Sequence, residues 1–274
     1  MNLTQSAGSL APPGGRAAPR PRAALAARVA ALPGLLPALT LVLVVAAWQA
    51  AVSLFDVADY LVPPPADVWR SLVDQHALLL EHGRTTLVET LWGFALSAAV
   101  GIPLAVAMKV WPLAGRALYP LLVSSQIVPK VAVAPLFVVW IGTGTTTSAL
   151  IAFVMAFFPV VVNTSLGLDS VDRESLMLIR SMGGRRRHAF RYLLLPASLP
   201  HMWTGLKLAM AFAVVGAIVG EFVGSQSGLG YLLIVAQGNL DTALIFADLV
   251  VLTVGGLLLY YAVDLIGRRV VRWS

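Results

Sequence analysis

Long stretches of this chain contain no Asp, Glu, Lys or Arg, and they limit what it can fold into. They run from Val29 to Phe55, from Thr90 to Met108 and from Val131 to Leu168. About 18 consecutive apolar residues suffice to cross the roughly 30 Å hydrocarbon core of a bilayer as a helix. A soluble helix of that length alternates apolar with polar residues, and these runs do not. We therefore expect an all-α, polytopic membrane protein.

The composition agrees with this expectation. Hydrophobic residues make up 58% of the chain and charged residues 12%, with a mean hydropathy of +0.84. A typical soluble domain is about 45–50% apolar and about 25% charged. We place about six transmembrane helices, at 34–55, 86–108, 117–141, 146–168, 203–224 and 244–266.

The distribution of basic residues predicts the orientation, because Lys and Arg concentrate in cytoplasmic loops. With the amino terminus inside, the outer loops hold only Arg70 and Arg84. The inner segments hold Arg16, Arg20, Arg22, Arg28, Lys109, Arg116, Arg173, Arg180, Arg185, Arg186, Arg187, Arg191, Arg268, Arg269 and Arg272. We expect a multi-pass protein of the inner (plasma) membrane with both termini in the cytoplasm. The net charge of +6 then reflects membrane topology and membrane lipid, not nucleic-acid binding.

The chain divides into three regions. Residues 1–32, rich in Pro, Ala and Arg, predict a disordered cytoplasmic tail. A basic segment followed by an apolar one also fits a cleaved signal peptide, but the run from Leu35 to Phe55 is longer than a signal core. Residues 33–83 hold the first transmembrane helix and an outer amphipathic loop, and residues 84–270 hold the transmembrane core with a cytoplasmic loop at 169–200.

The outer loop contains three prolines followed by "ADVWRSLV". An N-cap at Asp67 predicts an amphipathic helix lying along the membrane surface, with Val68, Leu72, Leu79 and the Trp69 ring on its apolar face. A plain loop is the alternative interpretation.

The stretch "SMGGRRRHAFRYLLLPASLP" (181–200) interrupts the apolar sequence. Asp169 or Ser170 is placed to cap a helix that begins near Val171 and ends at Gly183–Gly184. A second helix follows over Arg186–Leu195 and ends at Pro196. Simple anchoring of a basic loop to lipid headgroups is the alternative, but it requires no glycine pair. DNA binding is excluded because membrane spans tether both ends of this helix–turn–helix.

This spacing resembles the "EAA" loop of inner-membrane permeases of binding-protein-dependent ABC importers, which reads approximately E-A-A-x-x-x-G, then L-P, then a second proline. Met177, Leu178 and Ile179 occupy the E-A-A positions, and Gly183, Leu195–Pro196, Pro200 and "GLKLA" (205–209) complete the pattern. The flanking "VPKVAVAPLFVVWIGTGT" and "AIVGEFVGSQSGLGYLL" resemble the nitrate, sulfonate and taurine branch, which includes importers of pyrimidine precursors and riboflavin.

The resemblance implies a type I ABC importer permease whose first loop helix is a coupling helix, seated in a groove of a cytosolic ATPase. The residues it assigns to this contact are Glu174, Met177, Arg180, Gly183, Gly184, Arg185, Arg186 and Arg187. The family's glutamate, which is expected to meet a basic residue of the ATPase, is Met177 here. Glu174 or the flanking arginines are the expected replacements in that contact.

The resemblance also implies the partners: two ATP-binding ABC ATPase subunits, a second permease copy in a homodimer, and a periplasmic or lipid-anchored solute-binding protein. The chain has no phosphate-binding G-x-x-x-x-G-K-[ST] motif, so ATP hydrolysis is expected on the separate subunit and this chain is not an enzyme. It has no Cys, and its His residues lie in loops without metal-ligand spacing, so we expect no metal and no cofactor on this chain.

Lys130 lies well inside the predicted third span, between Pro129 and Val131. A charge at that depth costs at least about 2.5 kcal/mol and marks a candidate for a translocation path. Ser125 and Gln126 lie within about one turn and complete this candidate path with Glu221. A salt bridge between Lys130 and Glu221 that holds the helices together is the alternative.

We therefore predict the permease subunit of an ATP-driven importer for a small solute, for example an organic anion such as a sulfonate, or a nitrate- or pyrimidine-type nutrient. An ion-gradient-driven secondary transporter is the rival hypothesis. It would require several buried carboxylates along a path. Glu221, Asp248 and Asp264 are expected near span ends.

Overall fold

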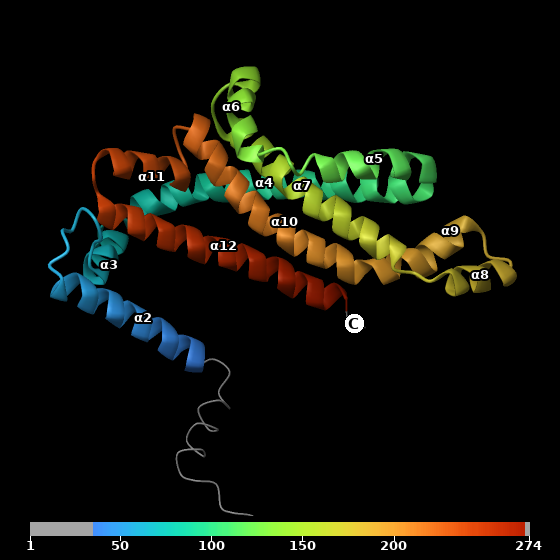
Figure 1. Cartoon of the computed structure of the whole chain (residues 1–274), viewed down its shortest axis with the longest axis horizontal. Coiled ribbons are helices and arrows are strands. Elements are labelled where there is room, and N and C mark those ends of the chain that lie inside the picture. Colours follow the sequence, from blue (N-terminus) through green and yellow to red (C-terminus); the bar gives the residue numbers. More distant parts are fainter. Residues whose placement is uncertain (1–34, 272–274) are drawn as a thin grey trace, which may run out of the picture. The chain divides into compact units, whose positions relative to one another are not determined.

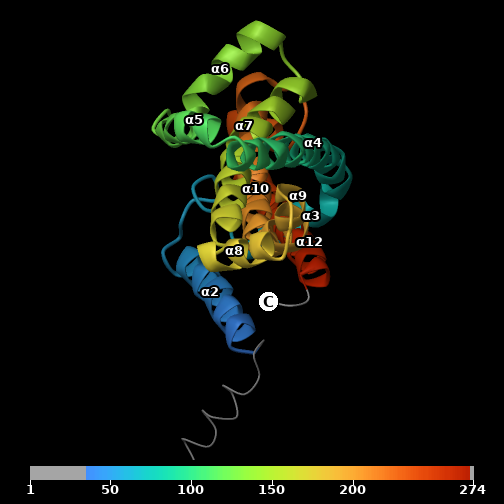
Figure 2. The same ribbon diagram turned by 90° about the vertical axis from the view of Figure 1, so that its right-hand side faces the viewer.

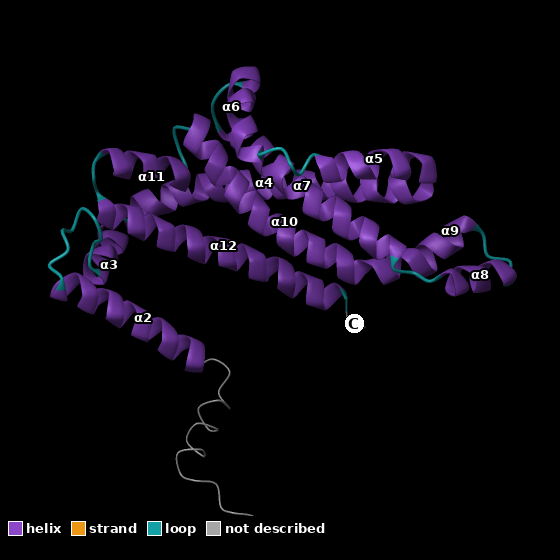
Figure 3. Cartoon of the chain, viewed as in Figure 1, coloured by secondary structure: helices purple, strands orange, loops and turns teal. Residues whose placement is uncertain are grey.

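The computed structural model describes residues 35–271, and every regular element in that range is a helix (Figures 1 and 3). The described residues fall into two units, 35–56 and 57–271. Within the first unit, the described element is α2 (Leu35–Leu54). The predicted tail, residues 1–32, lies outside the described residues.

The second unit contains the remaining helices. In chain order they are α3 (Pro65–Asp74), α4 (His76–Val110), α5 (Pro112–Ser124), α6 (Lys130–Ile141), α7 (Thr145–Asp169), α8 (Arg173–Ser181), α9 (Arg186–Ala189), a π-helical turn (Phe190–Leu194), α10 (Leu195–Gly224), α11 (Leu229–Gly238) and α12 (Thr242–Val270).

Four helices of the described range are long and apolar enough to cross a membrane. They are α4, α7, the continuous segment Arg186–Gly224 and α12, and they confirm the expectation of a polytopic helical protein. Three shorter apolar helices accompany them, namely Ala38–Leu54, α6 and α11.

The second unit has two ends, which we name by the helices that lie there (Figure 1). At the α8 end, the Lys109 side chain at the end of α4 contacts Asp169 at the end of α7. Near the α11 end, the backbone N–H of Gly144 donates to the carbonyl of Gly224 at 2.9 Å, so α7 begins where α10 finishes. The long helices therefore run between the same two ends.

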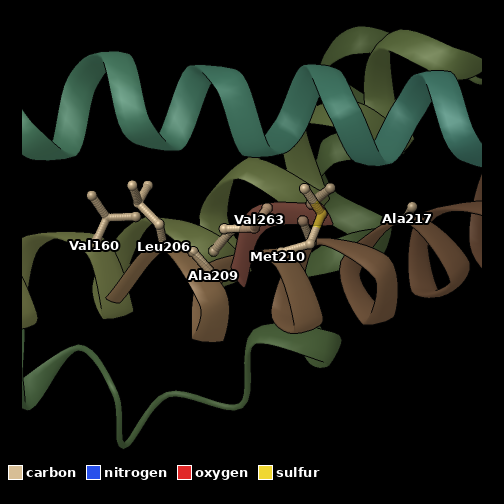
Figure 4. Close-up of a cluster of buried hydrophobic side chains, with 9 residues drawn as sticks. Val160, Leu206, Ala209, Met210, Ala217 and Val263 are labelled. Atoms are coloured by element: carbon tan, nitrogen blue, oxygen red, sulfur yellow. The ribbon is translucent and has the colours of Figure 1, made fainter. Parts of the chain in front are cut away.

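The core of this unit is the contact between α7 and α10, which lie side by side in both views (Figures 1 and 2). Small residues bring the two backbones together, as is common between membrane helices. A Cβ atom added at Gly216 would lie 2.6 Å from the Cα of Ala152. Around this contact Val160, Leu206 and Met210 form a buried apolar cluster (Figure 4).

The predicted span 117–141 is two helices, α5 and α6, separated by residues 125–129. Pro129 has no backbone N–H, so it cannot continue the hydrogen-bond ladder of α5, and its fixed φ suits the residue that precedes a new helix. The hydroxyl of Ser125 donates to the carbonyl of Leu122 at 2.7 Å and satisfies one acceptor at the end of α5. The apolar composition of 117–141 concealed this break.

The outer loop does form a helix, so the plain-loop alternative is wrong, but its predicted cap is also wrong. The helix α3 begins at Pro65, with Pro64 at the N-cap position. Asp67 lies in the first turn, where it accepts a hydrogen bond from Arg70 at 2.7 Å. Proline at the first helical position explains the earlier start, because its missing N–H is not needed there.

Candidate functional site

The first candidate site is the projection at the α8 end, formed by residues 172–187, which we call the elbow. Its helix α8 begins after Asp172, whose carboxylate accepts from the backbone N–H of Ser175 at 3.4 Å. The predicted caps were wrong because α7 runs further than expected: Asp169 is its last residue and Ser170 its C-cap. Asp172 is the first acid beyond that end with the extended backbone that an N-cap requires.

The predicted helix stop at the glycine pair is confirmed, and the two glycines act differently. Gly183 has a φ of 80°, a left-handed conformation that other residues rarely adopt. Its N–H donates to the carbonyl of Arg180 at 3.0 Å, and the N–H of Gly184 donates to that of Ile179 at 2.8 Å. This pair of bonds is the Schellman ending of a helix. A Cβ at Gly184 would lie 2.6 Å from the Ile179 carbonyl oxygen, so both positions favour glycine.

The elbow exposes an apolar surface with charges around it. Met177 is 62% exposed, Leu178 61% and Met182 78%. The side chains of Glu174, Arg180, Arg185, Arg186 and Arg187 are exposed as well, and none belongs to a salt bridge within the described residues. A compact apolar patch ringed by unpaired charge is typical of a protein–protein contact.

The predicted ending of the second helix at Pro196 is wrong. Helical structure continues from Arg186 to Gly224, through a π turn at Phe190–Leu194. In that turn the N–H of Leu195 donates to the carbonyl of Phe190. In this wider turn a backbone N–H donates to the carbonyl five residues earlier instead of four. The change of partner comes just before Pro196, which has no backbone N–H of its own. The elbow is thus joined to a long apolar helix without an intervening loop.

The second candidate site is the break between α5 and α6. Ser125 and Gln126 lie in it, exposed in the single chain, and Lys130 is the first residue of α6. The Lys130 ammonium lies 5.6 Å from the centre of the Phe158 ring, a cation–π contact.

Lys130 and Glu221 form no ion pair in the described part of the chain. Glu221 is 1% exposed and accepts hydrogen bonds from the Thr86 hydroxyl, at 2.6 Å, and from the backbone N–H of Gly230. The same Thr86 oxygen accepts from the N–H of Leu229 at 2.8 Å. The structure therefore brings Ser125, Gln126 and Lys130 together, whereas Glu221 anchors the start of α11.

Two further buried carboxylates accompany Glu221, and sequence reasoning did not identify them as a group. Glu89 and Asp248 are fully buried, and their oxygens accept no hydrogen bond from the described residues. Both interact electrostatically with Glu221. Asp248 was expected only as a charge near a span end. The available signal was an acid, Glu89, immediately before the uncharged run 90–108, since an acid among apolar residues marks a helix face that must be covered by protein.

The ion pairs that join helices were likewise not predicted. The Nζ atom of Lys207 lies 2.9 Å from Oδ1 of Asp264, and Nε of Arg268 lies 2.7 Å from Oδ2 of the same carboxylate. Asp264 thereby connects α10 to α12 near the α8 end. Lys207 and Asp264 are 57 positions apart in the sequence, so only the fold brings them together, whereas Arg268 lies one turn from Asp264 on the same helix.

Comparisons with known proteins agree on one family. Residues 97–272 match the family described as binding-protein-dependent transport system inner membrane component. The riboflavin transport system permease protein of Chloroflexus aurantiacus is 37% identical over 239 residues, which cover 86% of this chain and 88% of that protein. The formylaminopyrimidine transport permease protein of Halalkalibacterium halodurans is 34% identical over 238 residues, covering 86% and 95% respectively.

A further relative and a solved structure extend the comparison. The taurine transport system permease protein of Escherichia coli is 26% identical over 241 residues, which cover 85% of this chain and 88% of that protein. Among solved structures, an inward-facing conformation of the MetNI methionine ABC transporter aligns with a TM-score of 0.59 and 22% identity. The alignment covers 73% of this chain and 97% of that chain, which shows a shared fold.

Proposed function

This chain belongs to the family of binding-protein-dependent transport system inner membrane components, so it is the permease subunit of an ABC importer, and we propose that it carries a small organic anion. Family membership excludes the alternative of a secondary transporter driven by an ion gradient. The relatives serve solutes as different as riboflavin and taurine. The solute class is therefore argued from this chain's own residues.

The break between α5 and α6 carries the proposal. Backbone that is irregular at membrane depth is tolerated only where protein or a watery cavity satisfies its polar groups. Transporters use such broken helices at their solute sites, and the first N–H groups of a half-helix attract negative charge. Here the first residue of α6 is Lys130, which adds a full positive charge at the same point. Within the described residues no carboxylate neutralises it.

The elbow supplies the contact with a separate ATPase. Its exposed Met177, Leu178 and Met182 fit an apolar groove, and the surrounding arginines fit acidic residues on the groove's rim. The Schellman ending makes α8 a rigid unit, and unbroken helix joins the following segment to α10. Closure of an ATPase dimer would therefore move the spans and would not be absorbed in a loop.

A second copy of this chain completes the translocation path. The α5 and α6 helices and the break between them expose large apolar side chains, including Leu121, Ile127, Val139 and Trp140. A homodimer that buries this surface places two α5–α6 breaks opposite each other. The solute-binding protein docks at the α11 end. The distribution of basic residues in the loops predicts that this end lies outside, and that both termini and the elbow lie in the cytoplasm.

The test identifies the solute and then measures its transport. Thermal shift of the cognate solute-binding protein is recorded with sulfonates, carboxylates, nitrate and neutral pyrimidines, because a ligand raises the unfolding temperature of the protein it binds. The permease, its ATPase and the loaded binding protein are then reconstituted in vesicles. We expect ATP-dependent uptake of an anion. ATP-dependent uptake of neutral or cationic solutes alone would contradict the proposed solute class.

A further inference from the structure

A basic cavity of about 680 Å³ lies at the α8 end, between α4, α5, the end of α7 and the start of α8. It is distinct from the α5–α6 break and from the apolar patch of the elbow. Its apolar lining includes Ala105, Met108 and Pro112. Its polar lining consists of Lys109, Arg116, Tyr119, Ser165, Asp169 and Arg173.

The charges of this lining do not cancel. The Lys109 ammonium lies 2.5 Å from Oδ1 of Asp169, and this ion pair accounts for the only carboxylate of the lining. Arg116 and Arg173 have no salt-bridge partner among the described residues. The cavity therefore presents two unpaired guanidinium groups. Guanidinium is planar and offers several donors in a fork that matches the oxygens of a phosphate group.

One buried hydroxyl of the lining is also unsatisfied. Ser165 is 7% exposed, and its Oγ atom has no hydrogen-bond partner in the described part of the chain. A serine within a helix usually donates to a carbonyl of the preceding turn, as Ser97 does to Gly93 at 2.7 Å. Leaving a buried polar group unpaired is unfavourable unless a ligand or water completes the bond. Ser165 is thus available to a ligand that enters the cavity.

We propose that this cavity binds a phosphate-bearing anion, held by Arg116, Arg173 and the Ser165 hydroxyl. The phosphate belongs either to the headgroup of an anionic phospholipid or to free inorganic phosphate. Basic pockets between helices at the cytoplasmic level of a membrane protein bind anionic headgroups, and the apolar part of the lining would contact the glycerol and the first acyl carbons. The site is independent of the solute that the importer carries.

Binding at this site would connect two separate elements of the protein. Arg116 belongs to α5, the first half of the broken helix pair, and Arg173 is the first residue of α8. A phosphate that contacts both guanidinium groups therefore bridges the translocation path to the elbow. Its occupancy would favour one relative position of these two elements.

The test uses the purified full-length chain and native mass spectrometry. Bound lipid is counted after addition of dioleoylphosphatidylglycerol or dioleoylphosphatidylcholine. The variant combines Arg116→Gln with Arg173→Gln, both at exposed side chains, so that folding is preserved. The matched control is Arg191→Gln, an exposed arginine of the π turn that does not line the cavity. A second arm measures the thermal shift of each protein in sodium phosphate against sodium chloride of equal ionic strength.

Two results would support the proposal and also separate the sources. Preferential binding of phosphatidylglycerol that the double variant weakens by about tenfold or more, with Arg191→Gln unchanged, identifies a lipid headgroup. Stabilisation by inorganic phosphate that is lost in the double variant and in Ser165→Ala, without a lipid preference, identifies the free anion. If wild type and double variant respond equally to both probes, or if Arg191→Gln loses as much binding as the double variant, the proposal is overturned.

Discussion

The hydroxyl of Thr86 donates to Glu221 at 2.6 Å, and through this one oxygen three helices meet. Thr86 lies on α4 and Glu221 on α10, and the Thr86 oxygen also accepts from the backbone N–H of Leu229 at the start of α11. All of these groups are buried, so no water replaces a lost bond.

Replacing Thr86 with valine should therefore destabilise the protein. The substitution Thr86→Val keeps the shape but removes the hydroxyl that donates to Oε1 of Glu221 and accepts from the Leu229 N–H, which costs about 2 kcal/mol of unfolding free energy. The measurement is the thermal unfolding midpoint of the detergent-purified chain. Thr253→Val is the control, since Thr253 is exposed and its hydroxyl bonds only to Leu249 in the preceding turn. Equal midpoints for the two variants would show that the three-helix link contributes nothing.

The close contact between α7 and α10 predicts a second stability effect. In Gly216→Ala the new methyl carbon would lie 2.6 Å from the Cα of Ala152, a backbone atom that cannot rotate away. We expect the helices to separate and the free energy of unfolding to fall by about 1–3 kcal/mol. In Gly256→Ala the nearest side-chain atom lies at 3.7 Å, an ordinary contact, so this variant should match wild type. A wild-type midpoint for Gly216→Ala would contradict the tight packing.

Replacing Gly183, at the end of α8, should impair the coupling of ATP hydrolysis to transport without preventing folding. Gly183→Val places a β-branched residue at a φ of 80°, a strongly disfavoured combination, so the Schellman ending should open. We expect the complex with ATPase and loaded binding protein to lose its solute-stimulated ATP hydrolysis, while membrane insertion is retained.

The control for this change is Gly255→Val, at a position where an added Cβ meets no atom within 4 Å. Solute-stimulated ATPase activity of Gly255→Val should equal that of wild type. Full stimulation of the Gly183→Val complex would remove the coupling role proposed for the elbow.

Removing the charge of Lys130 should reduce transport without preventing assembly of the complex. Lys130→Met keeps an unbranched side chain, one atom shorter, and removes its charge, so an anionic solute loses a charge-assisted interaction worth about 1.5–3 kcal/mol, or about tenfold or more in uptake. Lys130→Arg should restore much of the rate. Co-purification of the ATPase reports assembly and should be the same for all three proteins. Unchanged uptake by Lys130→Met would show that Lys130 does not bind the solute and only packs against Phe158.

Sequence reasoning succeeded where the determinant was local. The positive φ at Gly183 and the end of α8 follow from two adjacent glycines, and uncharged runs locate the long helices. The cap of α8 was missed because Asp169, Ser170 and Asp172 are all suitable by residue type. The choice among them depends on where α7 ends, which packing against α10 decides.

The remaining differences arise from contacts between distant segments. The burial of Glu89 depends on α4 meeting α7 and α10. The acid before the uncharged run 90–108 indicates that this face of α4 is covered, but not which helices cover it. The break at 125–129 was signalled by Pro129, but Pro103 and Pro159 are tolerated inside continuous helices of the same chain. Proline alone therefore does not distinguish a broken helix from an intact one.

The π turn at Phe190–Leu194 also determines how α10, which follows it, is rotated about its own axis. A π turn contains one more residue than the α-helical turn it replaces, so it rotates each later side chain of the helix by about 100°. Deleting a single residue there would convert the turn to regular α-helix and swing Leu206 and Met210 off the side that meets α7. The sequence of this helix is thus in phase with its neighbours only because of a five-residue irregularity ahead of it. Length changes should be rarer at that point than in the loops around it.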